Sequence, residues 1–268
     1  MENQEKKAVL AVSFGTSFKE TREKALDVIE KDIREAFPGY EFCRAYTSPT
    51  VRRILQQRDG ICVDDVAGAL DRLWKEGYQK VVAQATHVIR GFEYNRMKDT
   101  LEGYRGRFDR LSYGGPLLAG EEDYRKVVRI LGRELGPYRG PGTALVFMGH
   151  GTGHEANASY AKLQQAFMEE GFEDCLVGTV EASPTLENMM KQVRSRRSRK
   201  VVLTPFLVVA GDHAHKDMAG GGEGSWKSRF LRSGYEVECV MRGLGEYAGI
   251  RQIYVGHGKE AEKEAENV

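Results

Sequence analysis

The chain has 268 residues, of which 41% are hydrophobic and 29% are charged. This balance excludes a disordered or collagen-like chain, and the length predicts about two compact domains. Lys and Arg (40 residues) nearly balance Asp and Glu (39 residues) and leave a net charge of +1, so neither nucleic acid nor an anionic membrane is expected as a partner.

The sequence also carries no signal for a membrane or an export pathway. Its longest mostly apolar run, at 201–210, is about half of the roughly 20 residues that a spanning helix needs. The first seven residues lack the apolar core of a signal peptide. The four cysteines are far apart and form no Cys-x-x-Cys pair, which is typical of reduced thiols. We therefore expect a cytoplasmic protein.

Apolar runs alternate with amphipathic helical stretches along the chain. Strands are predicted at 8–14, 41–46, 80–89, 108–113, 143–148, 174–180, 200–209 and 235–241. Helices are predicted at 19–36, 49–57, 63–76, 93–105, 121–135, 155–170, 185–196, 225–233 and from 246 onward, with fraying after Lys259. This alternation predicts an α/β fold of two similar Rossmann-like domains, each a four-stranded parallel sheet flanked by helices. We place the domains at 1–120 and 121–268, with the C-terminal helix 246–268 able to pack on the first.

Three short motifs occur twice, in the same order. Residues 14–16 (FGT) match 150–152 (HGT), 47–50 (TSPT) match 182–185 (ASPT), and 80–91 match 200–211, at offsets of 136, 135 and 120 residues. Three collinear matches predict an internal duplication. In both copies the Ser-Pro-Thr motif is expected to begin a helix, with Ser as the N-cap and Pro at the first helical position.

The copies differ at the predicted carboxyl ends of their strands, where open α/β sheets place their ligands. Phe14 corresponds to His150, Tyr46 to Glu181 and Glu93 to His213. Burial of a Glu carboxylate at the end of a strand costs free energy unless the carboxylate is paired or binds a ligand. Two imidazoles and a carboxylate that converge on one crevice can bind a divalent metal. The second half is therefore the predicted metal-binding half.

The other conspicuous residues leave alternatives open. For His154, His215 and His257 we favour ordinary structural roles. His87 lies near the end of a predicted strand and either faces the crevice or belongs to the core. Arg44, Arg52 and Arg90 either face an anionic ligand or are solvated. The four glycines in 220–224 form either a mobile lid or a surface loop. No Gly-rich phosphate-binding motif follows a strand, so a nucleotide site is not supported. We also expect that the protein needs no other organic cofactor.

The sequence resembles the anaerobic cobalt chelatases of cobalamin biosynthesis. The motifs that carry the resemblance are VFMGHGTGH (146–154), GTVEASPT (178–185), LTPFLVVAGDHAHKDM (203–218), QATHVIRGFEY (84–94) and RGLGE (242–246), and it extends from about residue 8 to 255. It implies the class II chelatase fold, with two similar α/β domains and a cleft between them. The family's His, Glu and His metal ligands fall on His150, Glu181 and His213, which also become the implied catalytic residues.

The implied activity is that of a lyase, the insertion of Co2+ into sirohydrochlorin with release of two protons. The eight carboxylates of sirohydrochlorin require local cations, for which Arg44, Arg52, Arg90 and Lys216 are candidates, and we add His87 and Glu93 as candidate substrate contacts. His213 is slightly favoured over His150 as the acceptor of the pyrrole protons.

The alternatives are a ferro- or nickel-chelatase that acts on sirohydrochlorin or a porphyrin, and a non-enzymatic carrier of metal or tetrapyrrole. Ligand chemistry does not separate the metals, because nitrogen and oxygen donors favour nickel at least as well as cobalt. A homo-oligomer is compatible with the sequence, which leaves the oligomeric state and the order of metal and ring binding open.

Overall fold

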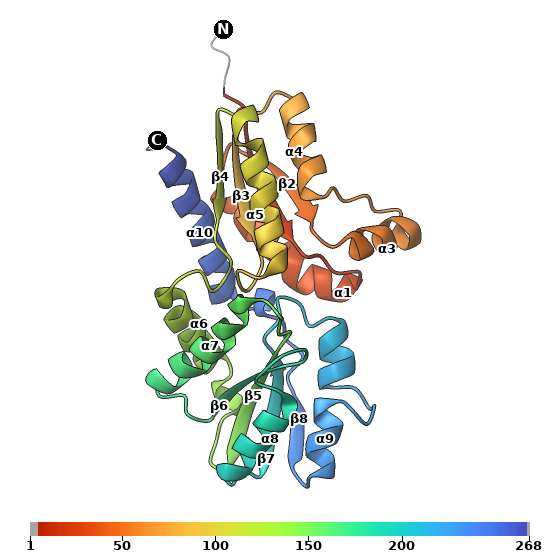
Figure 1. Cartoon of the computed structure of the whole chain (residues 1–268), viewed down its shortest axis with the longest axis vertical. Helices are drawn as coiled ribbons and strands as arrows, with labels where there is room; N and C mark the ends of the chain where they lie inside the picture. The colour runs from red at the N-terminus through yellow and green to blue at the C-terminus, as the bar shows by residue number, and fades with distance from the viewer. Residues whose placement is uncertain (1–4, 267–268) are drawn as a thin grey trace. The chain divides into compact units, whose positions relative to one another are not determined.

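The computed structural model describes residues 5–266, which form two compact units (Figure 1). The first unit contains the chain up to Ala119 together with the segment from Ile250 onward, and the second unit is Gly120–Gly249. Residues 1–4 and 267–268 lie outside the described residues. They include part of the N-terminal segment in which we expect no signal peptide, and the last two residues of the predicted C-terminal helix.

Unit 1 is built on a parallel four-stranded sheet with the strand order β2-β1-β3-β4. Its strands are β1 (Lys7–Ser13), β2 (Glu41–Tyr46), β3 (Lys80–Ala85) and β4 (Arg110–Gly114). Its helices are α1 (Lys19–Thr21), α2 (Asp27–Ala36), α3 (Pro49–Asp59), α4 (Val66–Lys75), α5 (Phe92–Tyr104) and α10 (Ala248–Glu266), with a π-helical turn Arg22–Leu26 between α1 and α2.

Unit 2 repeats this design, with a parallel sheet of order β6-β5-β7-β8. Its strands are β5 (Thr143–Gly149), β6 (Cys175–Thr179), β7 (Lys200–Pro205) and β8 (Glu236–Cys239). Its helices are α6 (Glu121–Glu134), α7 (Ala158–Glu169), α8 (Leu186–Ser195) and α9 (Trp226–Arg232), with a π-helical turn Ala214–Met218 before α9. The expected architecture of two similar α/β domains with parallel four-stranded sheets is confirmed.

Each sheet is buried by helices whose apolar faces pack on it. In unit 1, α4 and α5 share one core cluster with alternate residues of all four strands. In unit 2, α8 and α9 do the same, and Figure 1 shows α9 beside β8. Successive side chains of a strand point to opposite faces of the sheet. On the other face of the unit 2 sheet, Phe147 of β5 stacks on Phe167 of α7, with their ring centres 4.9 Å apart. Continuously apolar strands such as β1 are therefore buried on both faces.

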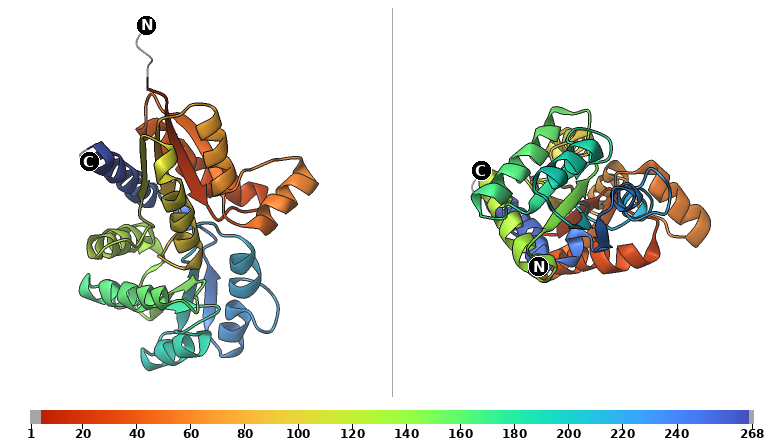
Figure 2. Two further views of the ribbon diagram at one scale, coloured as in Figure 1. Left: turned by 45° about the horizontal axis from the view of Figure 1, so that its top comes forward. Right: turned by 90° about the horizontal axis from the view of Figure 1, so that it is seen from below.

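The last helix, α10, packs on the sheet of unit 1 (Figures 1 and 2). The Tyr254 hydroxyl donates to the Thr86 carbonyl at 2.9 Å, and the buried Lys80 ammonium lies 2.6 Å from the Glu266 carboxylate and 3.9 Å from that of Glu262. The two Lys80 contacts lie near the C-terminal end of the helix and stabilise it there. The helix continues to Glu266, so the predicted fraying after Lys259 is wrong.

Two strands are shorter than the sequence predicts. The apolar runs at 80–89 and 200–209 end as strands at Ala85 and Pro205. Beyond these points the backbone carbonyls of His87 and Leu207 accept hydrogen bonds from Leu117 and Leu244, outside the sheet ladders. The apolar side chains that follow each strand therefore belong to ordered loops, and hydropathy alone does not distinguish these loops from the strand.

The hydrogen bonds of the two sheets align the two copies. Ser13 pairs with Tyr46, and Gly149 pairs with Thr179. Tyr46 is thus equivalent to Thr179, and the predicted equivalence of Tyr46 and Glu181 is wrong. The β2–α3 connection contains only residues 47–48, whereas the β6–α8 connection contains residues 180–185. Glu181 lies in this longer connection. Its extra residues shift the Ser-Pro-Thr motif of the second copy relative to the sheet, so the motif match and the sheet register disagree.

The longer connection also changes how the second helix begins. Ser48 caps α3 by accepting a hydrogen bond from the Val51 amide at 3.3 Å, with Pro49 in the first turn as predicted. In the second copy, however, Thr185 caps α8, and the Ser183–Pro184 peptide bond is cis and precedes the helix. The predicted Ser183 cap is therefore wrong.

Glu30 of α2 makes the stability of the protein depend on pH. Burial raises the pKa of its carboxyl to about 7, against the opposing effect of the nearby Arg44 guanidinium, whereas the ordinary value is 4.5. The folded protein therefore holds this proton more tightly than the unfolded chain, and the free energy of unfolding should fall by up to about 3 kcal/mol as pH rises from 4.5 to 7. Denaturant unfolding at several pH values measures this slope. Glu30→Gln should reduce it, and equal slopes in the two proteins would contradict the assignment.

The helices of the described residues include none with the length and apolar character required to cross a membrane.

Candidate functional site

Three side chains of unit 2 that the sequence singled out lie close together. His150, Glu181 and His213 each offer one ligand atom, and these atoms lie within 4.8 Å of one another. His150 Nδ1 is 3.6 Å from Glu181 Oε2, and the two imidazole ring centres are 4.6 Å apart. No other group of three His, Cys, Asp or Glu residues within residues 5–266 meets the same condition. The donor set of two nitrogens and one oxygen suits a divalent transition metal.

His150 and Glu181 are positioned by the backbone at the ends of β5 and β6. The Glu181 amide donates to the His150 carbonyl at 2.9 Å, which holds the two loops together. Gly151 follows His150 with φ +83°, and a Cβ there would lie 2.8 Å from the Ala182 amide nitrogen and the Thr179 hydroxyl. Glycine permits both this left-handed conformation and the close approach of the two loops.

His213 reaches the group from the turn that follows β7. It is the second residue of a short helical turn that begins at Asp212 after Gly211 and continues into the π-helical turn. Its Nδ1 lies 2.7 Å from Asp217 Oδ2, one turn further along the helix. With Nδ1 engaged by a carboxylate, Nε2 is the nitrogen available to a metal, which is the usual arrangement of carboxylate, histidine and metal.

Sequence reasoning missed Asp217. The signal was present, because Asp217 follows His213 by four residues and residues at this spacing share one face of a helix. The glycines around the histidine cluster instead favoured an irregular loop, in which that spacing has no meaning.

The side chains of two predicted anion-binding residues are engaged within unit 1. Arg44 Nη2 contacts Asp27 Oδ1 at 3.0 Å and also contacts Glu30. Arg52 Nη2 contacts Asp65 Oδ2 at 3.0 Å. In unit 2, Lys216 pairs with Asp212 at 2.9 Å, but this pair is largely exposed and its ammonium can exchange partners at low cost.

His87, Arg90 and Glu93 lie on the segment between β3 and the first turn of α5. Both ring nitrogens of His87 are buried and, within the described residues, have no hydrogen-bond partner. Burial lowers its pKa to about 4, so the ring is neutral at physiological pH. Glu93 Oε2 is likewise buried without a hydrogen-bond partner in residues 5–266. Arg90 is exposed, and its Nη2 donates to the Ala119 carbonyl at 3.4 Å.

His154 has a structural role. Its Nδ1 accepts a hydrogen bond from the Ala156 amide at 3.0 Å and caps the 3-10 turn that precedes α7. This nitrogen is therefore engaged at the start of the turn, in agreement with the ordinary role favoured from the sequence.

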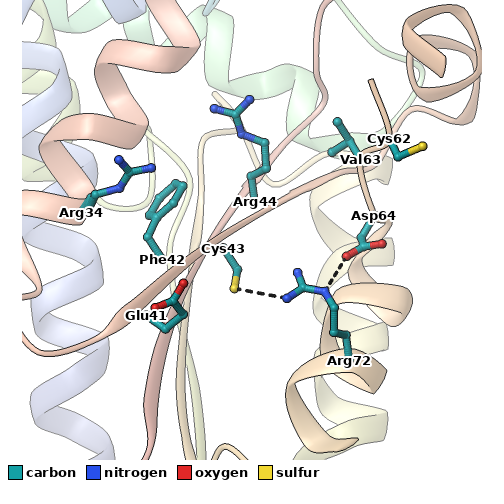
Figure 3. Close-up of a pocket in the computed structure, with 9 residues that line it drawn as sticks. All are labelled: Arg34, Glu41, Phe42, Cys43, Arg44, Cys62, Val63, Asp64 and Arg72. Carbon is teal, nitrogen blue, oxygen red and sulfur yellow. Dashed lines mark hydrogen bonds and ion pairs between the residues drawn. The ribbon is translucent and has the colours of Figure 1, made fainter. Parts of the chain in front are cut away.

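A separate pocket of about 300 Å³ lies beside the edge strand β2 of unit 1 (Figure 3). Its lining includes Arg44 as well as Cys43, Asp64 and Arg72. Figure 3 shows the Arg72 guanidinium between the Cys43 thiol and the Asp64 carboxylate, at 4.0 Å and 3.1 Å. Burial raises the pKa of the Cys43 thiol and keeps it protonated. These contacts give the pocket a structural character, and it contains no residue of the group of three ligands.

Comparison with known proteins assigns the chain to a family. The family described as cobalt chelatase (CbiK) matches residues 7–263. Sirohydrochlorin cobaltochelatase of Salmonella typhimurium is 39% identical over 256 residues, which cover 96% of this chain and 96% of that protein. Sirohydrochlorin cobaltochelatase CbiKC of Nitratidesulfovibrio vulgaris is 36% identical over 254 residues, which cover 94% of this chain and 89% of that protein.

A solved structure supports the fold. SirB from Bacillus subtilis with Fe3+ has a TM-score of 0.66 at 12% identity, and the match covers 98% of each chain. At this identity the likeness concerns the fold alone, whereas the family match and the two relatives each extend over nearly the whole chain. The chain therefore belongs to the cobalt chelatase family.

Proposed function

We propose that this protein is a sirohydrochlorin cobaltochelatase, which exchanges Co2+ for the two pyrrole protons of sirohydrochlorin. The observation that carries the proposal is the group of His150, Glu181 and His213 at one edge of the unit 2 sheet, with ligand atoms within 4.8 Å, in a member of the cobalt chelatase family. The names of its relatives support the substrate and the metal. We further propose that the reaction needs no organic cofactor and takes place in the cytoplasm, where thiols such as the four free cysteines stay reduced.

The ligand set suits a metal that must be delivered rather than stored. Two neutral imidazoles and one carboxylate neutralise half of the charge of a divalent ion and leave coordination positions open. All three side chains are at least 37% exposed, so solvent and substrate can reach the ion from the open side. A closed site of four thiolates would retain the metal instead.

The same side chains can take up the protons that the ring loses. As the ion moves from His213 Nε2 to the pyrrole nitrogens, that nitrogen becomes available to accept a proton. The Asp217 carboxylate, 2.7 Å from Nδ1, stabilises the resulting imidazolium. The second proton passes to one of the other two ligands, His150 or Glu181, or to solvent, so that two protons leave for each ion inserted.

The peripheral carboxylates of the substrate require exposed cations. We propose Lys216 and Arg90 for this role, because the first is in an exposed ion pair and the second is itself exposed. Arg44 and Arg52 are weaker candidates, since each guanidinium is held by an acidic side chain of its own unit. His87 and Glu93 remain proposed substrate contacts, supported by their buried polar atoms without hydrogen-bond partners in the described part of the chain.

Asp217→Asn tests the positioning of His213. An amide can still contact Nδ1 but no longer stabilises the imidazolium, so kcat for cobalt insertion should fall about 10- to 100-fold, with a smaller change in KM for sirohydrochlorin. Steady-state kinetics with Co2+ and sirohydrochlorin measure both constants. The matched control is Glu223→Gln, the same chemical change at a side chain that is 94% exposed. Equal rates in the two variants would remove Asp217 from the mechanism.

The proposed activity is tested by steady-state chelation with a metal panel. Purified protein is supplied with Co2+, Fe2+ or Ni2+ and with sirohydrochlorin or a porphyrin, and insertion is followed by the absorption change of the ring. The proposal predicts the highest kcat/KM for Co2+ with sirohydrochlorin. A higher value for another metal or for the porphyrin would contradict it.

A further inference from the structure

One side chain at the start of α7 contacts both loops that carry metal ligands at the ends of β5 and β6. The Thr152 amide donates to Asn157 Oδ1 at 3.1 Å, and Asn157 Nδ2 donates to the Ser183 carbonyl at 2.7 Å. Thr152 follows His150 by two residues, and Ser183 follows Glu181 by two residues. The Asn157 amide therefore joins the His150 loop to the Glu181 loop at the same distance along the chain from each ligand.

The two hydrogen bonds fix the orientation of this amide. Asn157 Oδ1 faces a backbone donor, and Nδ2 faces a backbone acceptor. The reversed amide would place donor against donor and acceptor against acceptor, so one orientation alone satisfies both loops. Asn157 also occupies the N-cap position of α7, but its backbone is helical there, and within residues 5–266 its side chain makes no capping hydrogen bond. Its polar groups thus serve the two loops and not the helix.

The loop that follows β6 needs such a contact more than its counterpart in unit 1 does. The Ser48 amide donates to the Phe14 carbonyl in unit 1, and the Glu181 amide makes the equivalent hydrogen bond in unit 2. Ser48 caps α3 directly, whereas Glu181 precedes Thr185, the cap of α8, by four residues. The backbone that follows Glu181 therefore belongs to neither the sheet nor the helix, and its position depends on side-chain contacts.

The first copy has a shorter side chain at the equivalent position. Thr21 matches Asn157 at the offset of 136 residues that also relates FGT to HGT. The Thr21 hydroxyl donates to the Phe18 carbonyl at 3.1 Å and lies 3.4 Å from the Thr16 hydroxyl, so both contacts stay within its own loop. An asparagine carries its donor and its acceptor on separate atoms and can join two loops. The bridge therefore distinguishes the copy that carries the metal ligands.

Both ligand side chains depend on their backbone for position. The side chains of His150 and Glu181 are 47% and 57% exposed, so little packing restricts them. The separation of their loops therefore sets how easily the two ligand atoms, now 3.6 Å apart, reach one ion. Side chains that hold metal ligands in place commonly contribute about 10- to 100-fold to metal affinity or activity.

We propose that Asn157 is a positioning residue of the metal site, which holds the His150 and Glu181 loops at the separation that suits a divalent ion. This inference rests on the proposed function for the identity of the ion as Co2+. It deepens that function, because it assigns the geometry of the site to a side chain outside the ligand set. It concerns binding of the ion before the ring receives it.

The test is titration of the protein with Co2+ in the absence of the ring, followed by the visible absorption of the bound ion, which depends on its coordination geometry. Asn157→Ala should raise Kd about tenfold and change the spectrum of bound Co2+. Asn157→Asp keeps an acceptor for the Thr152 amide but places an oxygen against the Ser183 carbonyl, so it should raise Kd as well. Its added negative charge alone would favour a cation, so a higher Kd in this variant reports the separation of the loops.

The matched control is Asn188→Ala. Asn188 Oδ1 accepts a hydrogen bond from the Thr185 amide at 2.8 Å at the start of α8. The same substitution there removes an asparagine that holds one end of the β6–α8 connection without joining the two loops. It should lower the temperature of thermal unfolding about as much as Asn157→Ala does, but leave the Kd and the spectrum of Co2+ unchanged. Thermal unfolding also verifies that each variant folds.

A Kd that rises in neither Asn157 variant would overturn the inference, as would an equal rise in Asn188→Ala. Wild-type protein that does not bind Co2+ would overturn it together with the assignment of the ligands. Failure of the proposed function alone is distinguishable, because wild-type protein would then bind Co2+ without inserting it into sirohydrochlorin. The Kd values of the variants would still decide the role of Asn157.

Discussion

Replacing His150 or His213 by alanine is expected to lower kcat for cobalt insertion by at least about 100-fold. Loss of a residue that merely supports a metal ligand already costs about 10- to 100-fold in affinity or activity, and loss of the ligand itself should cost no less. Each variant leaves one imidazole and Glu181, which together bind an exposed divalent ion weakly. The measurements are steady-state insertion rates and Co2+ titration of the protein without the ring, and both should show the defect.

The control for these variants lies in the same loop. His154→Asn removes an imidazole four residues from His150 but keeps a side chain that can accept the hydrogen bond from the Ala156 amide. It should retain a rate close to that of the wild type. If both alanine variants kept the full rate, or if His154→Asn lost as much activity as they do, the assignment of the ligands would be wrong.

Gly151→Ala is expected to impair both stability and activity. The residue has φ +83°, and its new Cβ would lie 2.8 Å from a backbone nitrogen and from the Thr179 hydroxyl. The left-handed conformation alone costs an alanine about 1–2 kcal/mol, and relief of the contact must move the loop of His150 away from the loop of Glu181. The free energy of unfolding should fall by about 2 kcal/mol or more, and the insertion rate should fall with it.

Gly153→Ala provides the comparison. This glycine is in the same loop, but its φ is not in the left-handed range and a Cβ there would meet nothing within 4 Å. The substitution should leave stability and rate nearly unchanged. Equal effects of the two substitutions would show that the loop tolerates displacement, and that the close approach of the His150 and Glu181 loops is not needed.

Much of the fold follows from the sequence because its signals are local. The central strands β1, β3, β5 and β7 are mostly apolar runs, and several helices begin at recognisable caps such as Ser48, Asp65 and Ser225. The duplication then orders these elements into two copies. His150 and His213 stand out because the first copy has Phe14 and Glu93 at the equivalent places.

The remaining features depend on register and on side-chain partners, which local patterns do not encode. The motif match placed Tyr46 against Glu181, but the length of the β6–α8 connection shifts that match away from the sheet register. The partner of His213 was hidden because its segment, although rich in glycine, forms helical turns. Arg44 was a candidate for the substrate because the sequence does not show that α2 brings Asp27 and Glu30 against it.

The central claim is that this protein inserts cobalt repeatedly, and the most direct measurement is multiple-turnover insertion of Co2+ into sirohydrochlorin by a small amount of wild-type protein. The account predicts that the product exceeds the protein many times over, at a rate proportional to protein concentration and well above the uncatalysed reaction. Formation of one product per protein molecule and no more would contradict it, and would identify a carrier of metal or tetrapyrrole instead of an enzyme.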